Sequence, residues 1–182
     1  AARASAAIAR EERGASLSLA AVEDVIDECY THLTQHLVSG VSTHQFSLGK
    51  PYHFYRPGLT KYGPEQWLWD SASHMTVWSH RNVSNALLDM RTMLSMQRAD
   101  GRVPEQIYWV DGDTSSKLQY SEQCCADLTQ MPVLPFALRA ILNASDAANT
   151  PALAQEFVPP LIKYFRWWRD TREVDGDGLV TI

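Results

Sequence analysis

The chain has 182 residues, of which 45% are hydrophobic, and it carries a formal net charge of −5. A domain of this length can remove about 70% of its unfolded surface from water, so the composition predicts a folded body. The acidic balance argues against nucleic acid and anionic membranes as partners, because both require basic patches, and no apolar run in the sequence approaches the roughly 18 to 20 residues of a membrane span.

The first predicted element is a helix over residues 17–38. Ser18 is a suitable N-cap and Gly40 a suitable stop. Residues 40–66 have no helical period and are rich in proline, glycine and aromatic side chains, so they are expected to form a long aromatic loop. The prediction of the helix over residues 17–38 depends on apolar side chains at helical spacing, namely Val22, Val25, Ile26, Cys29, Tyr30, Leu33 and Leu37.

Two further helices are predicted, from about Asp70 to Ser79 and from Asn82 to about Leu94, and together they would form a helical hairpin. A loop from Ala99 to about residue 121 follows. Within it, only residues 106–110 show the alternation expected of a strand.

The next predicted helix runs through Leu138, with an irregular or kinked entry at Pro132 and Pro135. A last helix extends from about Pro151 to Arg169 and is expected to be interrupted at residues 159–160, where two prolines follow one another. These patterns predict an all-α fold with long connections. They fit either a toroid built of helical hairpins or an irregular helical bundle.

The segment Trp67-Leu68-Trp69-Asp70 combines two indoles with a carboxylate at the start of a predicted helix. A sugar has an apolar face that stacks on indole and hydroxyl groups that donate to a carboxylate, so this grouping suits a carbohydrate. The alternative is that the tryptophans belong to the core and Asp70 caps the helix. His74, one helical turn after Asp70, could pair with it in acid/base chemistry or simply pack against neighbours.

The acidic segment at the end of the chain has carboxylates at Glu173, Asp175 and Asp177 followed by glycine, which is the opening spacing of a calcium loop. The twelfth ligand would fall beyond Ile182, and a solvated acidic turn is the alternative. No cofactor is therefore expected, apart from this candidate calcium site.

The three cysteines make no disulfide framework, because Cys124 and Cys125 are adjacent and Cys29 is left over. This slightly favours a cytoplasmic location. Asn82 and Asn143, however, each begin a sequon that would accept a glycan on the secretory route. The sequence therefore does not decide between a cytoplasmic and a secretory location.

Four ordered blocks of sequence resemble glycoside hydrolase family 63, which includes processing α-glucosidases and mannosylglycerate hydrolases. The resemblance covers about residue 62 to residue 182. The blocks are Gln66 to Ser71 with His74, Gln97 to Glu105, Thr129 to Val133, and Arg169-Asp170 with Asp175 to Leu179.

The resemblance implies that residues 1–182 are a single partial domain, the N-terminal part of an (α/α)6 toroid. It implies that Trp67, Trp69 and Asp70 hold the sugar and that Gln130 contacts it from a second hairpin. The family has an inverting acid and base, and its general acid follows the acidic block. Both catalytic carboxyls are therefore expected beyond Ile182, and no catalytic residue is assigned here.

The sequence thus predicts an inverting glycosidase of the α-glucoside or α-mannoside class, whose partner is an oligosaccharide or small glycoside. In this chain it would have pocket residues without the catalytic pair. The alternative is a non-catalytic carbohydrate-binding or helical scaffold protein. Since a full toroid needs more helices, apolar faces of the helices at 17–38 and 151–169 are expected to lack partners, making the chain marginally stable in isolation.

Overall fold

The computed structural model describes residues 19–43, 47–58, 65–110, 128–173 and 176–177. The chain divides into two compact units, Ala1–Leu37 and Val38–Ile182. The first unit contains α2 (Leu19–Thr34), none of whose side chains is buried. The predicted first helix is therefore confirmed to Thr34, whereas its expected N-cap, Ser18, lies outside the described residues.

Short strands replace much of the expected aromatic loop. β1 (Leu37–Val41) pairs with β2 (Pro51–Tyr55), and β3 (Glu65–Trp67) pairs antiparallel with β4 (Gln106–Tyr108). The prediction that Gly40 stops a helix is wrong, because Gly40 lies within β1. A Cβ there would come within 2.8 Å of the Tyr52 hydroxyl, so a larger residue would force the Tyr52 ring to shift.

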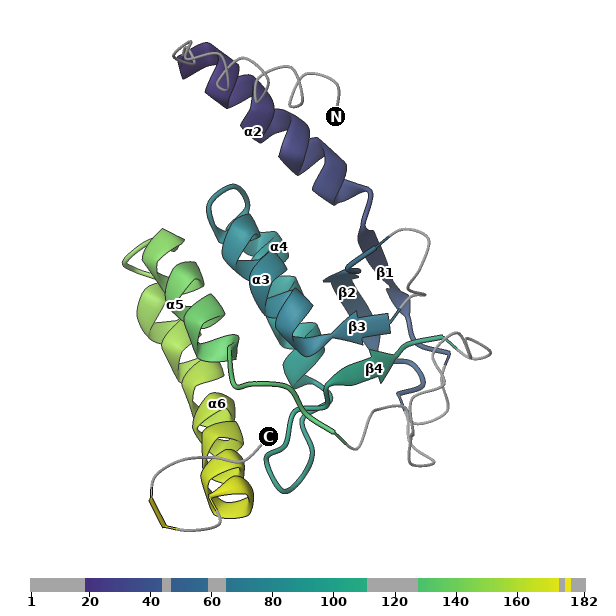
Figure 1. The fold of residues 1–182 in the computed structure, drawn as a ribbon, viewed down its shortest axis with the longest axis vertical. Helices are drawn as coiled ribbons and strands as arrows, with labels where there is room; N and C mark the ends of the chain where they lie inside the picture. The colour runs from purple at the N-terminus through teal and green to yellow at the C-terminus, as the bar shows by residue number, and fades with distance from the viewer. Residues whose placement is uncertain (1–18, 44–46, 59–64, 111–127, 174–175, 178–182) are drawn as a thin grey trace. The chain divides into compact units, whose positions relative to one another are not determined.

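Four helices form two hairpins in the second unit (Figure 1). They are α3 (Leu68–Ser79), α4 (Val83–Leu94), α5 (Leu134–Ala144) and α6 (Thr150–Arg172). α3 packs against both α4 and α5, so the hairpins lie side by side. The predicted helices at 70–79 and 82–94 are confirmed. Asn82 is the N-cap of α4, and its side chain accepts from the Asn85 N–H.

The all-α prediction is corrected to a mostly helical fold with two small two-stranded sheets in the described part of the chain. The strand expected within 106–110 is confirmed as β4. The core lies where the two hairpins meet each other and the strands. Its fully buried side chains include Leu68, Met75, Met90, Met93, Ile107, Trp109, Leu134 and Ile141.

Prolines disturb these helices less than the sequence suggests. Pro135 lies in the first turn of α5, where its missing N–H has no helical acceptor to lose, so no kink is needed. The expected interruption of α6 at residues 159–160 is also wrong, because the helix continues through both prolines. Its four buried side chains recur along one face and hold the helix in place; they are Phe157, Leu161, Tyr164 and Trp168.

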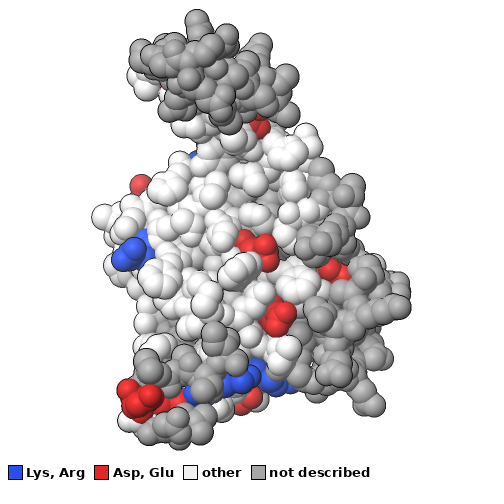
Figure 2. Space-filling view, in the orientation of Figure 1, with Lys and Arg blue, Asp and Glu red and all other residues white. Residues whose placement is uncertain are grey.

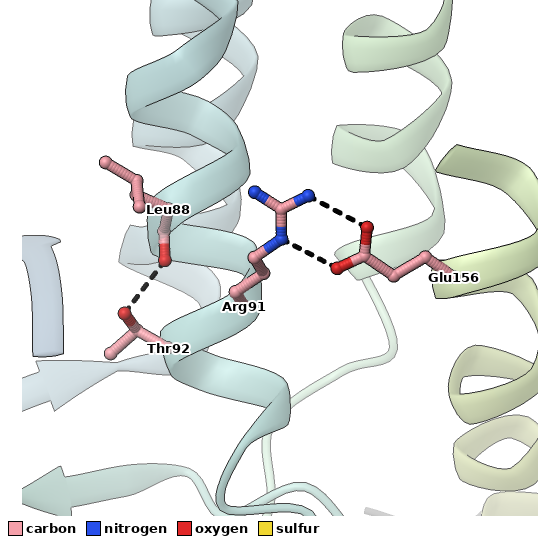
Figure 3. Close-up of polar contacts among 4 residues, drawn as sticks. All are labelled: Leu88, Arg91, Thr92 and Glu156. Atoms are coloured by element: carbon pink, nitrogen blue, oxygen red, sulfur yellow. Dashed lines mark hydrogen bonds and ion pairs between the residues drawn. The ribbon is translucent and has the colours of Figure 1, made fainter. Parts of the chain in front are cut away.

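An ion pair joins the two hairpins. The Nε and Nη2 atoms of Arg91 on α4 lie 2.6 and 2.8 Å from the two carboxylate oxygens of Glu156 on α6 (Figure 3). The Arg91 guanidinium also lies 5.6 Å from the centre of the Phe157 ring. This fork geometry links α4 to α6 at the surface.

Two surface features bear on function. The face over α3 and α5 carries mostly uncharged side chains, with isolated acidic and basic ones among them (Figure 2). α5 and α6 enclose an apolar groove of about 470 Å³, to which Val158, Ile162 and Phe165 contribute partly exposed side chains. Among the described helices, none is long and apolar enough to span a bilayer.

Candidate functional site

The candidate site centres on residues 67–70, which we call the junction segment because β3 ends at Trp67 and α3 begins at Leu68. Pairing with β4 fixes the strand end, since Trp67 lies opposite Gln106. The Leu68 N–H then donates to the Glu105 carbonyl at 2.9 Å. The start of the junction segment is therefore held in place by backbone hydrogen bonds.

The four side chains of the junction segment differ in exposure. Leu68 is fully buried, whereas Trp69 is 51% exposed, and Trp67 and Asp70 are half-buried. The interpretation of both tryptophans as core residues therefore fails for Trp69. Its indole borders a groove of about 190 Å³ formed by α3 and the start of α5, lined also by Ala72, Ser73, Thr76, Val133 and Phe136.

Gln130 reaches the junction segment from the second hairpin. Its Oε1 accepts a hydrogen bond from the Trp69 backbone N–H at 2.8 Å. The N-cap residue, Trp67, makes no side-chain cap bond, and its indole offers no acceptor. Gln130 thus satisfies one of the free N–H groups at the start of α3, and its amide NH₂ is left to donate elsewhere.

Hydrogen bonds to the segment before β4 and to α6 hold Gln130 and its neighbour Thr129 in place. The Tyr164 hydroxyl lies 2.7 Å from the Gln130 carbonyl and 2.6 Å from the Thr129 hydroxyl. Thr129 in turn donates to the Val103 carbonyl at 2.6 Å. Tyr164 is 1% exposed, so this anchor is buried. Nothing in the sequence indicated this role for Tyr164, because its partner Gln130 is 34 positions away.

Asp70 lies in the first turn of α3, where the helix dipole favours a carboxylate. Partial burial raises its pKa, and a hydrogen bond from its own backbone N–H partly opposes that rise. It is not the N-cap that the alternative interpretation assumed, because Trp67 has that position. His74 is also half-buried, and its ring packs edge-on to Tyr55 with centroids 6.0 Å apart.

A buried polar network lies beneath the junction segment. Gln66 donates from Nε2 to Oδ1 of Asp89 at 2.9 Å and accepts from the Trp109 indole N–H at 3.2 Å. Asp89, on α4, is 1% exposed, and burial raises its pKa to about 8. Burial and the nearby Asp89 raise the pKa of Tyr55 to about 12. Sequence reasoning missed Asp89, although a carboxylate between Ala86 and Met93 on the apolar face was the available signal.

The arrangement can bind a ring that has one apolar face and a hydroxyl-bearing edge. The exposed Trp69 indole offers a stacking surface, Asp70 offers acceptors, and the Gln130 amide offers a donor. Sugar contact by Trp67, Trp69, Asp70 and Gln130 stays a prediction. So does the calcium loop, because Asp175 lies outside the described residues.

Comparison with known proteins identifies relatives of residues 63–182. That segment matches the family model described as the mannosylglycerate hydrolase MGH1-like glycoside hydrolase domain. Mannosylglycerate hydrolase MGH1 of Selaginella moellendorffii is 28% identical over 124 residues, which are 64% of this chain and 25% of that protein. Glucosylglycerate hydrolase of Mycolicibacterium hassiacum is 26% identical over 137 residues, covering 65% and 31% respectively.

A solved structure shares the fold. The GH63 mannosylglycerate hydrolase of Thermus thermophilus, crystallised with glucose, aligns with a TM-score of 0.60 at 24% identity. The alignment covers 71% of this chain and 32% of that one. The chain therefore spans about a quarter to a third of the length of these relatives.

Proposed function

Because the chain belongs to the mannosylglycerate hydrolase MGH1-like glycoside hydrolase family, we propose that the full-length protein hydrolyses a small α-glycoside. The α-mannoside or α-glucoside of a hydroxy acid such as glycerate is the proposed substrate, since relatives are named as mannosylglycerate and glucosylglycerate hydrolases. Residues 67–70 and Gln130 would hold the sugar. The observation that carries this proposal is the 2.8 Å bond from the Trp69 N–H to Gln130, which joins the two hairpins at an exposed indole.

Each proposed contact follows from the geometry of its side chain. The half-exposed Trp69 indole would stack on the C–H face of the sugar, with the half-buried Trp67 beside it. Asp70 would accept from sugar hydroxyls, and its raised pKa would return toward normal as those hydroxyls donate to the carboxylate. Since Gln130 Oε1 is already used by α3, its Nε2 would donate to a hydroxyl oxygen.

The catalytic acid and base are proposed to be residues of the full-length protein that lie outside residues 1–182. An inverting glycosidase needs two carboxyl groups roughly 6.5 to 9.5 Å apart, one to protonate the leaving oxygen and one to activate water. Asp70 is proposed to bind sugar rather than to donate the proton. The two hairpins would form part of an (α/α)6 toroid, in which a further hairpin would cover the apolar groove of α5 and α6.

The proposal is tested with the full-length protein, by measuring sugar released from mannosylglycerate and glucosylglycerate. We expect Asp70→Asn to lower kcat/KM by roughly ten- to a hundredfold, the loss of a charge-assisted hydrogen bond. Asp146→Asn, which changes an exposed carboxyl on the α5–α6 connection, serves as the control and should leave kcat/KM unchanged. Equal activity of Asp70→Asn and wild type would remove Asp70 from the site.

Three additional results test the mechanism and separate the alternatives. Proton NMR of the first product should show the β-anomer released from an α-glycoside, as inversion requires. Sugar-dependent tryptophan fluorescence without any hydrolysis would instead favour a carbohydrate-binding protein. A Trp67→Ala variant that unfolds, with no ligand response in wild type, would favour a helical scaffold.

A further inference from the structure

Asp89 contacts the residues on either side of the junction segment. Its Oδ1 accepts from Nε2 of Gln66, the residue before Trp67, at 2.9 Å. The hydroxyl of Ser71, the residue after Asp70, and the backbone of Tyr55 on β2 lie near enough to the same carboxyl to act on its pKa. One side chain of α4 thus bonds to the residue before the four-residue segment and adjoins the residue after it.

The surroundings of Asp89 favour its neutral form. The side chain is 1% exposed, and the groups that act on it are an amide, a hydroxyl and a backbone group, none of which is cationic. An ionised carboxylate in such a place would suffer a large desolvation penalty. Burial therefore raises the pKa of Asp89 to about 8, and the carboxyl is mostly protonated near pH 7.

Gln66 is held at both ends of its amide. Its Nε2 donates to Asp89, and its Oε1 accepts from the Trp109 indole at 3.2 Å. Gln66 is fully buried, so neither bond competes with water. Loss of the acceptor on Asp89 would leave a buried N–H group without its partner, directly before Trp67.

We propose that Asp89 is a positioning residue that fixes the start of the junction segment through its buried hydrogen bond to Gln66, so that Trp67, Trp69 and Asp70 are preorganised for sugar. Preorganisation lowers the ordering cost of binding, so the effect should fall on KM more than on kcat. The kinetic part of this inference rests on the proposed glycosidase function, whereas the ordering of residues 67–70 does not.

The experiment compares three full-length variants. Asp89→Asn keeps an acceptor oxygen for Gln66 in a side chain of the same shape. Asp89→Leu removes that acceptor. Thr92→Val is the matched control, because Thr92 is a buried polar residue on the same helix whose hydroxyl accepts from His53 on β2 instead of contacting the junction segment.

Hydrogen–deuterium exchange of the backbone amides of residues 66–71 is measured without substrate, and KM and kcat are measured on mannosylglycerate. We expect Asp89→Leu to speed exchange in this segment and to raise KM by about tenfold with a smaller change in kcat. Asp89→Asn should stay within about twofold of wild type in both measurements, and Thr92→Val should leave exchange in this segment and KM unchanged.

Three results would overturn the inference. They are a folded Asp89→Leu variant with wild-type exchange and KM, an Asp89→Asn variant as impaired as Asp89→Leu, and an equal effect of Thr92→Val. If wild type releases no sugar, the proposed function fails while the exchange data still decide the inference. If Asp89→Leu does not fold, Gln66→Met, which removes the donor, takes its place in the exchange measurement.

Discussion

Gln130 is expected to have two separable roles, one for each end of its side-chain amide. Its Oε1 accepts from the Trp69 N–H at 2.8 Å, so Gln130→Ala removes the bond that caps α3. Loss of a cap costs about 1 kcal/mol, which for a chain of this size lowers Tm by about 2–4 °C. Gln130→Glu keeps an acceptor oxygen there, and a negative charge near a helix N-terminus is favourable, so its Tm should match wild type or exceed it.

The two variants should nevertheless be alike in their response to sugar, because neither has the amide NH₂. Losing one neutral hydrogen bond of about 1 to 1.5 kcal/mol weakens binding by roughly five- to thirteenfold. Calorimetry gives Tm, and tryptophan fluorescence titrated with mannosylglycerate gives Kd. Wild-type affinity in Gln130→Glu would refute the donor role, and an unchanged Tm in Gln130→Ala would refute the capping role.

Four other substitutions test the stability of the fold around the site. Gly101→Ala should cost several kcal/mol in urea unfolding, because Gly101 has φ +107° and a Cβ would lie 2.6 Å from the Lys163 carbonyl. Gly49→Ala, at φ +79° with nothing nearby, should cost only about 1 kcal/mol. Arg91→Met should cost less than about 1 kcal/mol, because both side chains of its ion pair with Glu156 are over two-fifths exposed. The ion pair lowers the pKa of Glu156, so that cost should vanish as pH falls through this lowered value. Burial raises the pKa of Asp89 to about 8 in the folded state. The contribution of its protonated form to the free energy of unfolding is therefore complete below the unfolded pKa near 4 and declines as pH rises toward 8. The free energy of unfolding of wild type relative to Asp89→Asn, measured with denaturant, should fall over that range.

Local sequence patterns predicted the helices well because each spans several turns. α3 and α4 repeat their apolar face often enough to be recognised, and Asn82 marks the start of α4. α6 shows the limit of local rules. Two prolines predict an interruption, but the burial of one face along a helix of 23 residues outweighs the loss of their N–H groups.

The strands other than β4 were harder to predict, because a short strand gives its alternating period little length in which to show. β2 has five residues and β3 and β4 have three each. Their stability comes from partners distant in sequence, as where Glu65 lies opposite Tyr108. The aromatic residues from Tyr52 to Tyr55 therefore read as a loop, whereas the Tyr52 ring packs on Trp109 with centroids 5.5 Å apart.

The residues of the candidate site also fall into two groups, those that the local sequence reveals and those that only the packed fold brings together. Trp69 and Asp70 could be identified from composition, because a ligand-binding surface requires particular side chains and these stand together in the sequence. The residues that hold them in place could not be identified from the sequence. Gln66 is bonded to Asp89, 23 positions away, and Trp69 is bonded to Gln130, 61 positions away. A buried polar group is stable only when a partner meets it, and that meeting is a property of the packed hairpins. The residues that set the precision of the junction segment are therefore on α4 and before α5, where the sequence by itself gives little sign of function.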